Sequence, residues 1–423
     1  MNILLASSTG IYDKSFSETK KDHNGFGIMV RALADMLAYE GDEVDIITNS
    51  VFTKGRKINK ANLLKKTWGS VFFHTKPFYI RKAFPFLMQK RLPFKTRLKE
   101  FLVFMTASYT EHLIKKNKYD VVHINGIGSR SLGYMYACVR TDTPFVLTLH
   151  GLNSFTDKIR STPFSKKMER NFFLLNKDNE KALSTVISTG IKRRLCEAIG
   201  KDLDTINVVC NPVINSSEAG VVPYEKADGE KVIVTVGNIS ENKNQRLVID
   251  AFAKMKSENE GKYKLFVIGG NESALKEYAK ENNITDVTFT GALDKSMVNE
   301  YYKIADLCVM ASVNEGFGLS LVEGYSYGVP SVMPESIDAY PDLYEEYSCV
   351  GAGDYEISTF ADALYTALQK EWDKEKIKEK ANDFTEEVCA SKYLSVLRRA
   401  AEFKSSPFDI KVLDEIVKKS KCK

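Results

Sequence analysis

The chain has 423 residues, of which 43% are hydrophobic and 27% charged, and its formal net charge at pH 7 is +5. This composition is that of a globular protein and excludes a disordered or collagen-like chain. The length is more than one ordinary core holds and favours two domains. Because no apolar run reaches the ~20 residues that span a bilayer, the sequence also argues against a transmembrane protein.

Cysteine usage points to a reducing compartment. The seven cysteines are scattered along the chain without a C-x-x-C pair. Such scattering predicts neither a disulfide framework nor a structural zinc site. The opening residues 1–8 are too short for a signal peptide and lack a basic leader. We therefore expect a cytoplasmic protein.

The first half of the chain alternates predicted strands and helices. A strand at 2–6, a helix following Gly25 and Gly27, and a strand at 43–48 form a βαβ opening. A helix is expected at 97–116, and further strands are expected at 119–125, 145–150, 184–188 and 206–210. Two of these strands carry a histidine near their end, His123 and His150. Ligands of open α/β sheets bind at the carboxyl ends of strands, and we take His150 as a functional candidate and His123 as a packed residue.

The segment 54–99 is strongly basic, with 14 Lys or Arg and no Asp or Glu. Without these 14, the chain keeps 46 of its 60 Lys and Arg against 55 Asp and Glu, a net charge of −9. Aromatic residues are interleaved with the cations, which suits a membrane surface. We expect an anionic membrane rather than nucleic acid as the partner, and a solvated helix face is the alternative. Reversing the charges of Lys65, Lys66, Lys90 and Arg91 should then abolish vesicle binding.

The second half restarts the alternation after a polar linker. Strands are expected at 231–237, 263–270 and 287–291, and helices at 295–305, 356–370 and 387–403. The first strand leads through Asn238 and Lys243 into a helix that contains Arg246. The tail at 408–418 is amphipathic with a basic end and received no assignment.

Residues 311–334 combine a glycine turn with two carboxylates. Glu315 precedes the turn, Glu323 lies on the helix that follows, and the turn itself consists of Gly316, Phe317, Gly318 and Leu319. Glycine lets the backbone approach a ligand, and the N–H groups and dipole of a first helical turn favour an anion, most often phosphate. Glu323 lies roughly 9 Å beyond the turn at 1.5 Å per residue. One carboxylate thus flanks each side of the anion site, as a sugar–diphosphate–ribose ligand requires.

This stretch, EGFGLSLVE, resembles the E-x7-E signature of the family 4 (group 1) retaining glycosyltransferases. The resemblance is strong over 231–334 and moderate over 119–212. It implies the GT-B fold, an α/β protein with two Rossmann-like domains facing each other across a cleft. The expected parts are an acceptor-side domain at 1–212, a linker at 213–230, a nucleotide-sugar-binding domain at 231–385, and C-terminal helices at 386–423, the first crossing back to the N-terminal domain.

The resemblance also implies roles for individual residues. Glu315 would face the donor sugar and Glu323 would bind the nucleotide ribose. Lys243 and the amides of Gly316, Phe317, Gly318 and Leu319 would hold the diphosphate, and His150 would point at the sugar. Gly25 and Gly27 stand where the family has a Gly-Gly pair that approaches the diphosphate and the acceptor.

The implied enzyme is a retaining, metal-independent hexosyltransferase without a cofactor, whose donor substrate is a nucleotide-diphosphate sugar. Its acceptor would be a glycan or a lipid-linked glycan in cell-surface polysaccharide synthesis, with the protein peripheral on the inner face of the membrane. The chain departs from the family pattern at Asn238, where an arginine is usual and Arg246 is the candidate substitute. A glycine pair usual after Pro334 is also missing.

Three alternatives remain. A metal-dependent transferase would use an Asp-x-Asp pair, for which Asp202 and Asp204 supply the string. A dehydrogenase is disfavoured because no G-x-G-x-x-G follows a predicted strand. A non-catalytic, membrane-associated subunit of a glycan-assembly complex would explain Asn238 and the missing glycine pair. The retained Lys243, Glu315 and Glu323 argue against that subunit.

Overall fold

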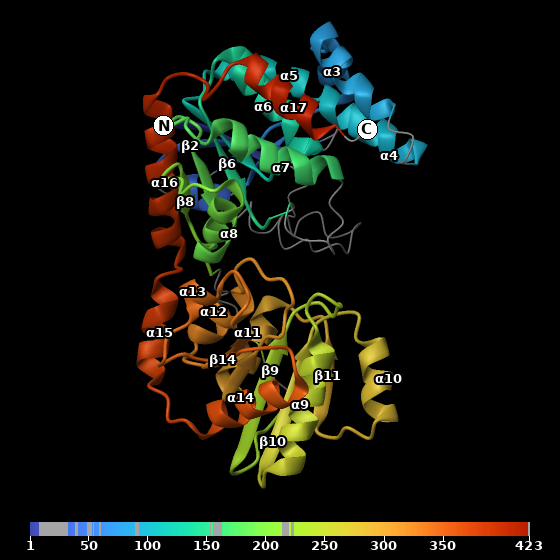
Figure 1. The fold of residues 1–423 in the computed structure, drawn as a ribbon, viewed down its shortest axis with the longest axis vertical. Coiled ribbons are helices and arrows are strands. Elements are labelled where there is room, and N and C mark those ends of the chain that lie inside the picture. Colours follow the sequence, from blue (N-terminus) through green and yellow to red (C-terminus); the bar gives the residue numbers. More distant parts are fainter. Residues whose placement is uncertain are drawn as a thin grey trace. The chain divides into compact units, whose positions relative to one another are not determined.

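The structure is a computed structural model that describes residues 1–7, 33–38, 41–48, 53, 55–58, 61–88, 93–152, 154, 163–213, 220 and 224–421. Its residue contacts separate two compact units. Unit 1 comprises Met1–Ile187, Ile191–Val209 and Ala390–Lys423, and unit 2 comprises Ser188–Gly190 and Cys210–Cys389. Each unit is built on one sheet with helices on its faces (Figure 1), which confirms the predicted two Rossmann-like domains.

The sheet of unit 1 has the strand order β3-β4-β2-β1-β5-β6-β7-β8. Its central strands pair in parallel, and β3 runs antiparallel to β4 at one edge. The strand bounds are Asn2–Ser7 (β1), Glu43–Thr48 (β2), Arg56–Ile58 (β3), Ala61–Leu63 (β4), Val121–Asn125 (β5), Phe145–Leu149 (β6), Ser184–Val186 (β7) and Ile206–Val208 (β8). Strand β1 is buried on both sides, as expected for a central parallel strand covered by helices.

The following helices lie wholly or mostly in unit 1. Their bounds are Trp68–Phe73 (α2), Pro77–Leu87 (α3), Phe94–Met105 (α4), Ala107–Asn117 (α5), Ser129–Thr141 (α6), Pro163–Asn176 (α7), Thr189–Ile199 (α8), Glu386–Glu402 (α16) and Ile410–Ser420 (α17). The amphipathic tail at 408–418, for which the sequence predicts no role, forms α17, which packs on α7 and α6. Leu413 and Ile416 of α17 are buried, and Asp414 accepts a hydrogen bond from the Tyr136 hydroxyl at 2.6 Å. The amphipathic tail is therefore part of the unit 1 core.

The single helix predicted at 97–116 is wrong, because the structure has two helices, α4 and α5, that meet at Thr106. The Thr106 hydroxyl donates a hydrogen bond to the carbonyl of Val103, in the last turn of α4, at 2.6 Å. A threonine that bonds back to the preceding turn competes with the backbone ladder and bends helices. The apolar periodicity continues across this bend, so it gave no signal of two helices.

Lys66 lies in the basic segment but is not a surface residue. Its side chain is 1% exposed, and Nζ donates to the Thr48 carbonyl at 2.5 Å. The expectation that Lys66 contributes to a charged surface is therefore wrong, and Lys90 and Arg91 lie outside the described residues. Burial lowers the pKa of Lys66 to about 7, because the charged ammonium loses its hydration.

We expect Lys66→Met to stabilise the protein more at pH 7 than at pH 10. Between these values the unfolded chain keeps the lysine proton and the folded chain loses it, so wild-type stability rises with pH across this window. The advantage of the variant should differ by up to about 4 kcal/mol over the three pH units. Denaturation followed by Trp68 fluorescence in a Trp372→Phe background would measure it.

Lys65→Met is the matched control for this prediction, since Lys65 is the exposed neighbour. Its effect on the free energy of unfolding should not change between the two pH values. The same pH dependence in Lys66→Met as in the wild type would contradict the assignment.

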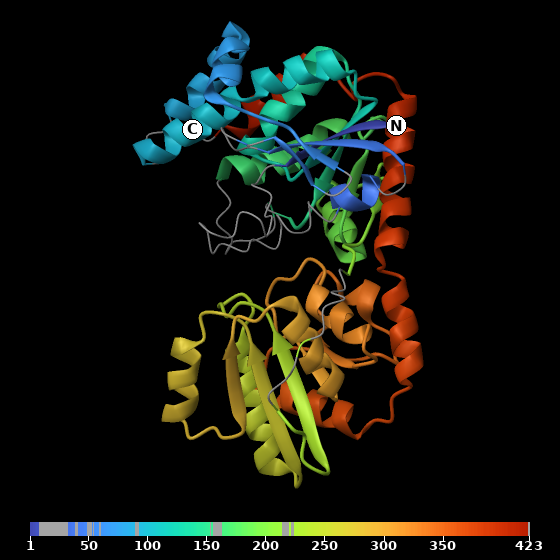
Figure 2. The ribbon, with the colours of Figure 1, turned by 180° about the vertical axis from the view of Figure 1, so that it is seen from behind.

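The sheet of unit 2 has the order β11-β10-β9-β12-β13-β14, and all its strands are parallel. The strand bounds are Glu230–Val236 (β9), Lys262–Ile268 (β10), Val287–Gly291 (β11), Leu307–Val309 (β12), Ser331–Pro334 (β13) and Cys349–Ala352 (β14). The helix bounds are Gln245–Glu258 (α9), Ser273–Glu281 (α10), Lys295–Ile304 (α11), Leu319–Tyr325 (α12), Tyr340–Leu343 (α13), Ile357–Gln369 (α14) and Lys374–Asn382 (α15). Figure 2 shows the strands of this sheet from the side opposite to Figure 1.

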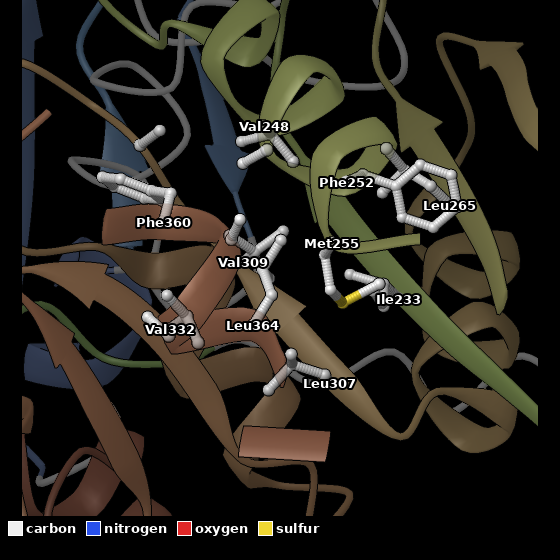
Figure 3. Close-up of a cluster of buried hydrophobic side chains, with 14 of the residues drawn as sticks. Ile233, Val248, Phe252, Met255, Leu265, Leu307, Val309, Val332, Phe360 and Leu364 are labelled. Carbon is white, nitrogen blue, oxygen red and sulfur yellow. The ribbon is translucent and has the colours of Figure 1, made fainter. Parts of the chain in front are cut away.

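Helices lie on both faces of this sheet. Leu265 belongs to the core cluster that α9 and α14 form with the strands, where Phe252 and Leu364 also lie (Figure 3). The next residue, Phe266, contacts the ring of Tyr301 from α11 at 5.0 Å between centroids. Successive strand residues point to opposite faces, so α9 and α14 cover one face and α11 the other. Among the described residues, no helix is both long and apolar enough to cross a bilayer.

Candidate active site

The loops after β9, β10 and β12 lie along one edge of the unit 2 sheet, because these strands are parallel neighbours. Gly237 follows β9 and Gly269 follows β10. A Cβ atom on Gly269 would lie 2.1 Å from the Gly237 carbonyl oxygen, so glycine at 269 lets the two backbones meet. The carboxyl edge of parallel strands is where open α/β sheets bind ligands, and this edge is the candidate site.

The loop after β12 is fixed to the loop after β9 by two hydrogen bonds. The Val313 N–H donates to the Asn242 carbonyl at 2.8 Å, and the Asn242 side-chain amide donates to the Asn314 carbonyl at 2.9 Å. Gly318, the last residue before α12, has φ 82°, in the left-handed region that favours glycine. Its N–H donates to Glu315 Oε1 at 3.3 Å. The turn therefore holds the Glu315 carboxylate against one of its own amides.

Lys243 and Glu315 form an ion pair across these two loops. The ammonium contacts Glu315 Oε2, and the Ser312 hydroxyl lies 3.5 Å from the same oxygen. Both charged side chains are partly exposed, with Glu315 17% and Lys243 31% accessible. The residue predicted to hold the leaving group and the residue predicted to face the sugar are therefore in direct contact, within reach of solvent and ligand.

Glu323 lies on α12, the helix that follows the turn. Its Oε1 forms an ion pair with Lys295 at the start of α11, and its Oε2 lies 3.3 Å from the Tyr302 hydroxyl. That hydroxyl also donates to the Ser320 carbonyl at 2.7 Å. Burial, together with the charge of Glu323, raises the pKa of Tyr302 well above its usual range. Tyr302 thus keeps its one hydroxyl proton, which lies between the Ser320 carbonyl and Glu323 Oε2, with the shorter contact to Ser320.

Sequence analysis missed Lys295 and Tyr302. Tyr302 is separated from Glu323 by 21 positions and carries no local signal of the contact. The sequence does contain one signal for Lys295. A cation at the first position of a helix is unfavourable to the helix dipole, so its presence there indicates a separate partner. The structure supplies that reason, which is the Glu323 carboxylate.

The remaining turn residues are Gly316, Phe317 and Leu319. Phe317 is 2% exposed and packs edge-on against Phe384 at 5.2 Å, so its side chain anchors the turn in the unit 2 core. Gly316 lies in the loop before it, and Leu319 begins α12, which is seven residues long. The Phe317 side chain is therefore not available to a ligand, and a role for the amides of the turn stays a prediction.

His150 lies in unit 1, immediately after β6. Its Nε2 lies 3.0 Å from the Asn125 side-chain oxygen at the end of the neighbouring strand β5. Burial lowers the pKa of His150 to about 4, so its ring is neutral at pH 7. His123 is wholly buried, contacts the Thr148 hydroxyl at 2.5 Å, and also has a burial-lowered pKa, of about 3. His123 is therefore a packed residue, whereas His150 stands at a strand end.

Metal-ligating side chains do not gather in the described part of the chain, where no cluster of three His, Cys, Asp or Glu could hold an ion. Asp202 and Asp204 lie between α8 and β8 of unit 1 and are exposed. Asp202 accepts a hydrogen bond from the Cys196 thiol at 3.6 Å. Both carboxylates thus lie in a different unit from the glycine turn.

Both halves of the chain match models of known protein families. The model for Glycosyltransferase Family 4 matches residues 23–215, and the model for Glycosyl transferases group 1 matches residues 219–384. The chain belongs to the group 1 and family 4 glycosyltransferases. The match confirms the resemblance that the E-x7-E stretch suggested.

Related sequences are enzymes of glycosyl transfer. This glycosyltransferase is 23% identical to D-inositol 3-phosphate glycosyltransferase of Nocardia farcinica over 82% of this chain and 77% of that one. It is 24% identical to N-acetyl-alpha-D-glucosaminyl L-malate synthase of Bacillus anthracis, over 73% and 75% of the two chains. It is 40% identical to alpha-monoglucosyldiacylglycerol synthase of Streptococcus pneumoniae over 108 residues, which cover 25% of this chain and 24% of that one. Its role is therefore the transfer of glycosyl groups.

Solved structures agree in fold. A glycosyltransferase from Rickettsia africae superposes with a TM-score of 0.66 at 14% identity, over 94% of this chain and 98% of that one. Sucrose-phosphate synthase from Thermosynechococcus elongatus gives 0.65 at 16% identity, with the same coverage. These likenesses concern the fold, in which both Rossmann-like units of the glycosyltransferase correspond to those of GT-B proteins.

The glycosyltransferase departs from its family pattern near Lys243. The Asn238 side-chain oxygen accepts a hydrogen bond from the Gly270 N–H at 3.4 Å and so ties the loops after β9 and β10. The Arg246 guanidinium lies 4.2 Å from the Tyr278 ring centroid, and its Nε lies 3.8 Å from Asp250. Both partners of Arg246 belong to α9 and α10, not to the loop that carries Glu315. Gly25 and Gly27 lie outside the described residues.

Proposed function

We propose that this glycosyltransferase moves a hexose from a nucleotide-diphosphate sugar to a glycan or lipid-linked glycan, with retention and without a metal ion or other cofactor. The observation that carries the proposal is that both glutamates of the E-x7-E signature, Glu315 and Glu323, pair with lysines at the carboxyl edge of the unit 2 sheet. Lys243 contacts Glu315, and Lys295 contacts Glu323. A nucleotide-diphosphate sugar needs both kinds of charge there, cations for its phosphates and carboxylates for its hydroxyls.

The donor site would form when the diphosphate of the donor replaces Glu315 as the partner of Lys243. In the structure, Glu315 neutralises Lys243 and accepts a hydrogen bond from the Gly318 amide. A bound diphosphate would take over Lys243 and the turn amides, which releases the Glu315 carboxylate for the sugar hydroxyls. The cation and amides stabilise the charge that grows on the leaving phosphate, and they do so without reorganising at the moment of reaction. Glu323, oriented by Tyr302 and Lys295, would accept the ribose hydroxyls.

The chemistry does not require a side-chain base. In a front-face path the leaving phosphate itself takes the proton of the acceptor hydroxyl, and the new bond forms on the face that the leaving group vacates. His150 is neutral at pH 7, because burial lowers its pKa to about 4, so its role would be a hydrogen bond to the sugar. The lysines supply positive charge of the kind that a divalent ion supplies elsewhere.

The basic segment supports a location on the inner, cytoplasmic face of a membrane, as in cell-surface polysaccharide synthesis. The segment between residues 54 and 99 has fourteen cations and no acid, and the cations other than the buried Lys66 favour anionic lipid. The Streptococcus pneumoniae relative is a monoglucosyldiacylglycerol synthase, which supports a lipid-linked acceptor. A peripheral protein with such an acceptor would meet its substrate at the bilayer surface.

A ligand screen followed by a transfer assay tests the proposal. Thermal shifts with nucleoside diphosphates and their sugars identify the donor, since a ligand at 100 times its Kd stabilises by about 2.7 kcal/mol. Transfer is then measured in excess chelator, and NMR gives the anomeric configuration of the product. Loss of activity in chelator or an inverted product would overturn the mechanism. Donor binding with neither hydrolysis nor transfer would favour the non-catalytic subunit instead.

A further inference from the structure

Among the described residues of unit 1, six large apolar side chains stand in solvent, on or directly after three consecutive helices. Each is more than half exposed, and Phe72 and Phe73 are each 85% exposed. The set, called here the aromatic surface, consists of Trp68, Phe72 and Phe73 on α2, Phe84 on α3, Met88 directly after α3, and Phe94 on α4. Helices α3 and α4 pack against each other and project from one end of unit 1 in both views (Figures 1 and 2).

Neighbouring side chains of the same helices make the unit 1 core. Val71, Tyr79 and Phe86 are buried, so α2 and α3 each use one face for packing and present the other. A water-soluble protein rarely exposes several large apolar side chains together unless the patch binds a partner. The composition of the segment could not separate these two sets, because both consist of the same residue types.

Exposed cations lie on the same helices as part of the aromatic surface. Arg81 on α3 and Lys95 and Lys99 on α4 are exposed. Two other lysines are taken up by acids of the unit, Lys76 by the buried Glu111 and Lys82 by Asp414. Helices α3 and α4 thus present exposed apolar side chains and exposed cations together in the same short stretch of chain.

The charge and the side-chain types of this surface favour an anionic bilayer as its partner. A second copy of the chain would bring two basic surfaces together, which is unfavourable. Single-stranded nucleic acid would stack its bases on aromatic rings, but Met88 of this set and the partly exposed Ile80 and Leu98 nearby in the chain are not aromatic and offer no stacking face. An anionic bilayer accepts both aromatic and aliphatic groups at the boundary of headgroups and acyl chains, and it pairs with the cations.

We propose that the aromatic surface inserts into the headgroup–acyl boundary of an anionic bilayer, with Phe72 and Phe73 entering deepest. The inference rests on the membrane location proposed above and is independent of the donor site in unit 2. Charge attracts the protein to the membrane, and apolar burial keeps it there. Such paired signals give stable peripheral binding where one alone gives weak binding.

Vesicle sedimentation tests the inference with the full chain. The probes are vesicles of phosphatidylcholine with phosphatidylglycerol, vesicles of phosphatidylcholine alone, and a single-stranded oligonucleotide. Phe72→Ser/Phe73→Ser should weaken binding to the anionic vesicles about 100-fold, at roughly tenfold per phenylalanine removed from the apolar boundary. The matched control, Ile357→Ser/Tyr365→Ser, changes two exposed apolar residues of α14 in unit 2 and should bind as the wild type does.

Insertion has a separate spectroscopic readout. Trp68 and Trp372 are the two tryptophans of the chain. In a Trp372→Phe background, Trp68 emission should shift to the blue on binding anionic vesicles. The triple variant Arg81→Gln/Lys95→Gln/Lys99→Gln should reduce the salt sensitivity of binding, because fewer charges are screened.

The outcomes separate the two proposals. Unchanged vesicle binding in Phe72→Ser/Phe73→Ser, or no shift of Trp68, overturns the insertion surface and leaves a purely electrostatic contact. No vesicle binding by the wild type at low salt overturns the membrane location as well. Salt-sensitive oligonucleotide binding that the phenylalanine variant loses would assign the surface to nucleic acid. Donor binding, measured without vesicles, reports on the transferase site in every case.

Discussion

Lys243→Ala should lower kcat about 100-fold or more while changing KM much less. The negative charge on the diphosphate grows as the glycosidic bond breaks, so a cation beside it stabilises the transition state more than the ground state. Lys243 is poised for this role, because its ammonium already contacts Glu315 at the glycine turn. Steady-state kinetics with the donor identified by the ligand screen would measure both constants.

Two control variants sharpen this test. Lys254 is paired with Glu258 on α9, away from the turn, and Lys254→Ala should leave both constants unchanged. Arg246→Ala should cost less than Lys243→Ala, because the Arg246 guanidinium is engaged by Tyr278 and Asp250. Equal losses in the two variants would instead make Arg246 the substitute for the arginine that the family usually has at position 238. A normal kcat in Lys243→Ala would move the leaving-group role elsewhere.

Glu323→Ala should weaken donor binding at least about tenfold, with kcat at saturating donor less affected. Hydrogen bonds to a charged group contribute about 1.5–3 kcal/mol each, and about 1.4 kcal/mol corresponds to a factor of ten in affinity. The loss should appear equally for the free nucleoside diphosphate, since the ribose is common to both ligands. Titration calorimetry with both ligands gives the comparison.

Glu258→Ala is the matched control, because Glu258 forms a similar lysine pair at a distance from the turn. Its donor affinity should equal that of the wild type. Unchanged affinity in Glu323→Ala would remove the ribose from this carboxylate. A loss seen with the nucleotide sugar but not with the nucleoside diphosphate would place Glu323 at the sugar instead.

Lys295→Met should weaken donor binding by a smaller factor than Glu323→Ala. Lys295 orients the carboxylate through its ion pair, and the hydroxyl of Tyr302 remains to hold Glu323 in the variant. If Lys295 instead contacts a phosphate directly, its loss will reduce kcat as the loss of Lys243 does. Comparison of kcat with KM in the two lysine variants separates these roles.

Local sequence pattern was sufficient for the fold class and for one side of the site. Short apolar runs, typical of buried parallel strands, alternate along the chain with segments of helical periodicity. In a chain of this length, few folds other than two doubly wound sheets have this alternation. The glycine turn, Glu315 and Glu323 form one continuous stretch, so their spacing was visible in the chain. The contact of Lys243 with Glu315 could be expected only through the family resemblance.

Tertiary structure decided what depends on residues far apart in the chain. Lys295 and Tyr302 reach Glu323 across more than twenty positions, because α11 and α12 pack together. The same holds for the basic segment, where Lys66 is buried against Thr48 while Phe72 and Phe73 stand in solvent. Residue type gives the preference for burial, but the packing of neighbouring elements determines which side chains are covered. The sequence by itself therefore determined the domains' class and the signature acids, and the tertiary structure decided their partners and the exposed surface.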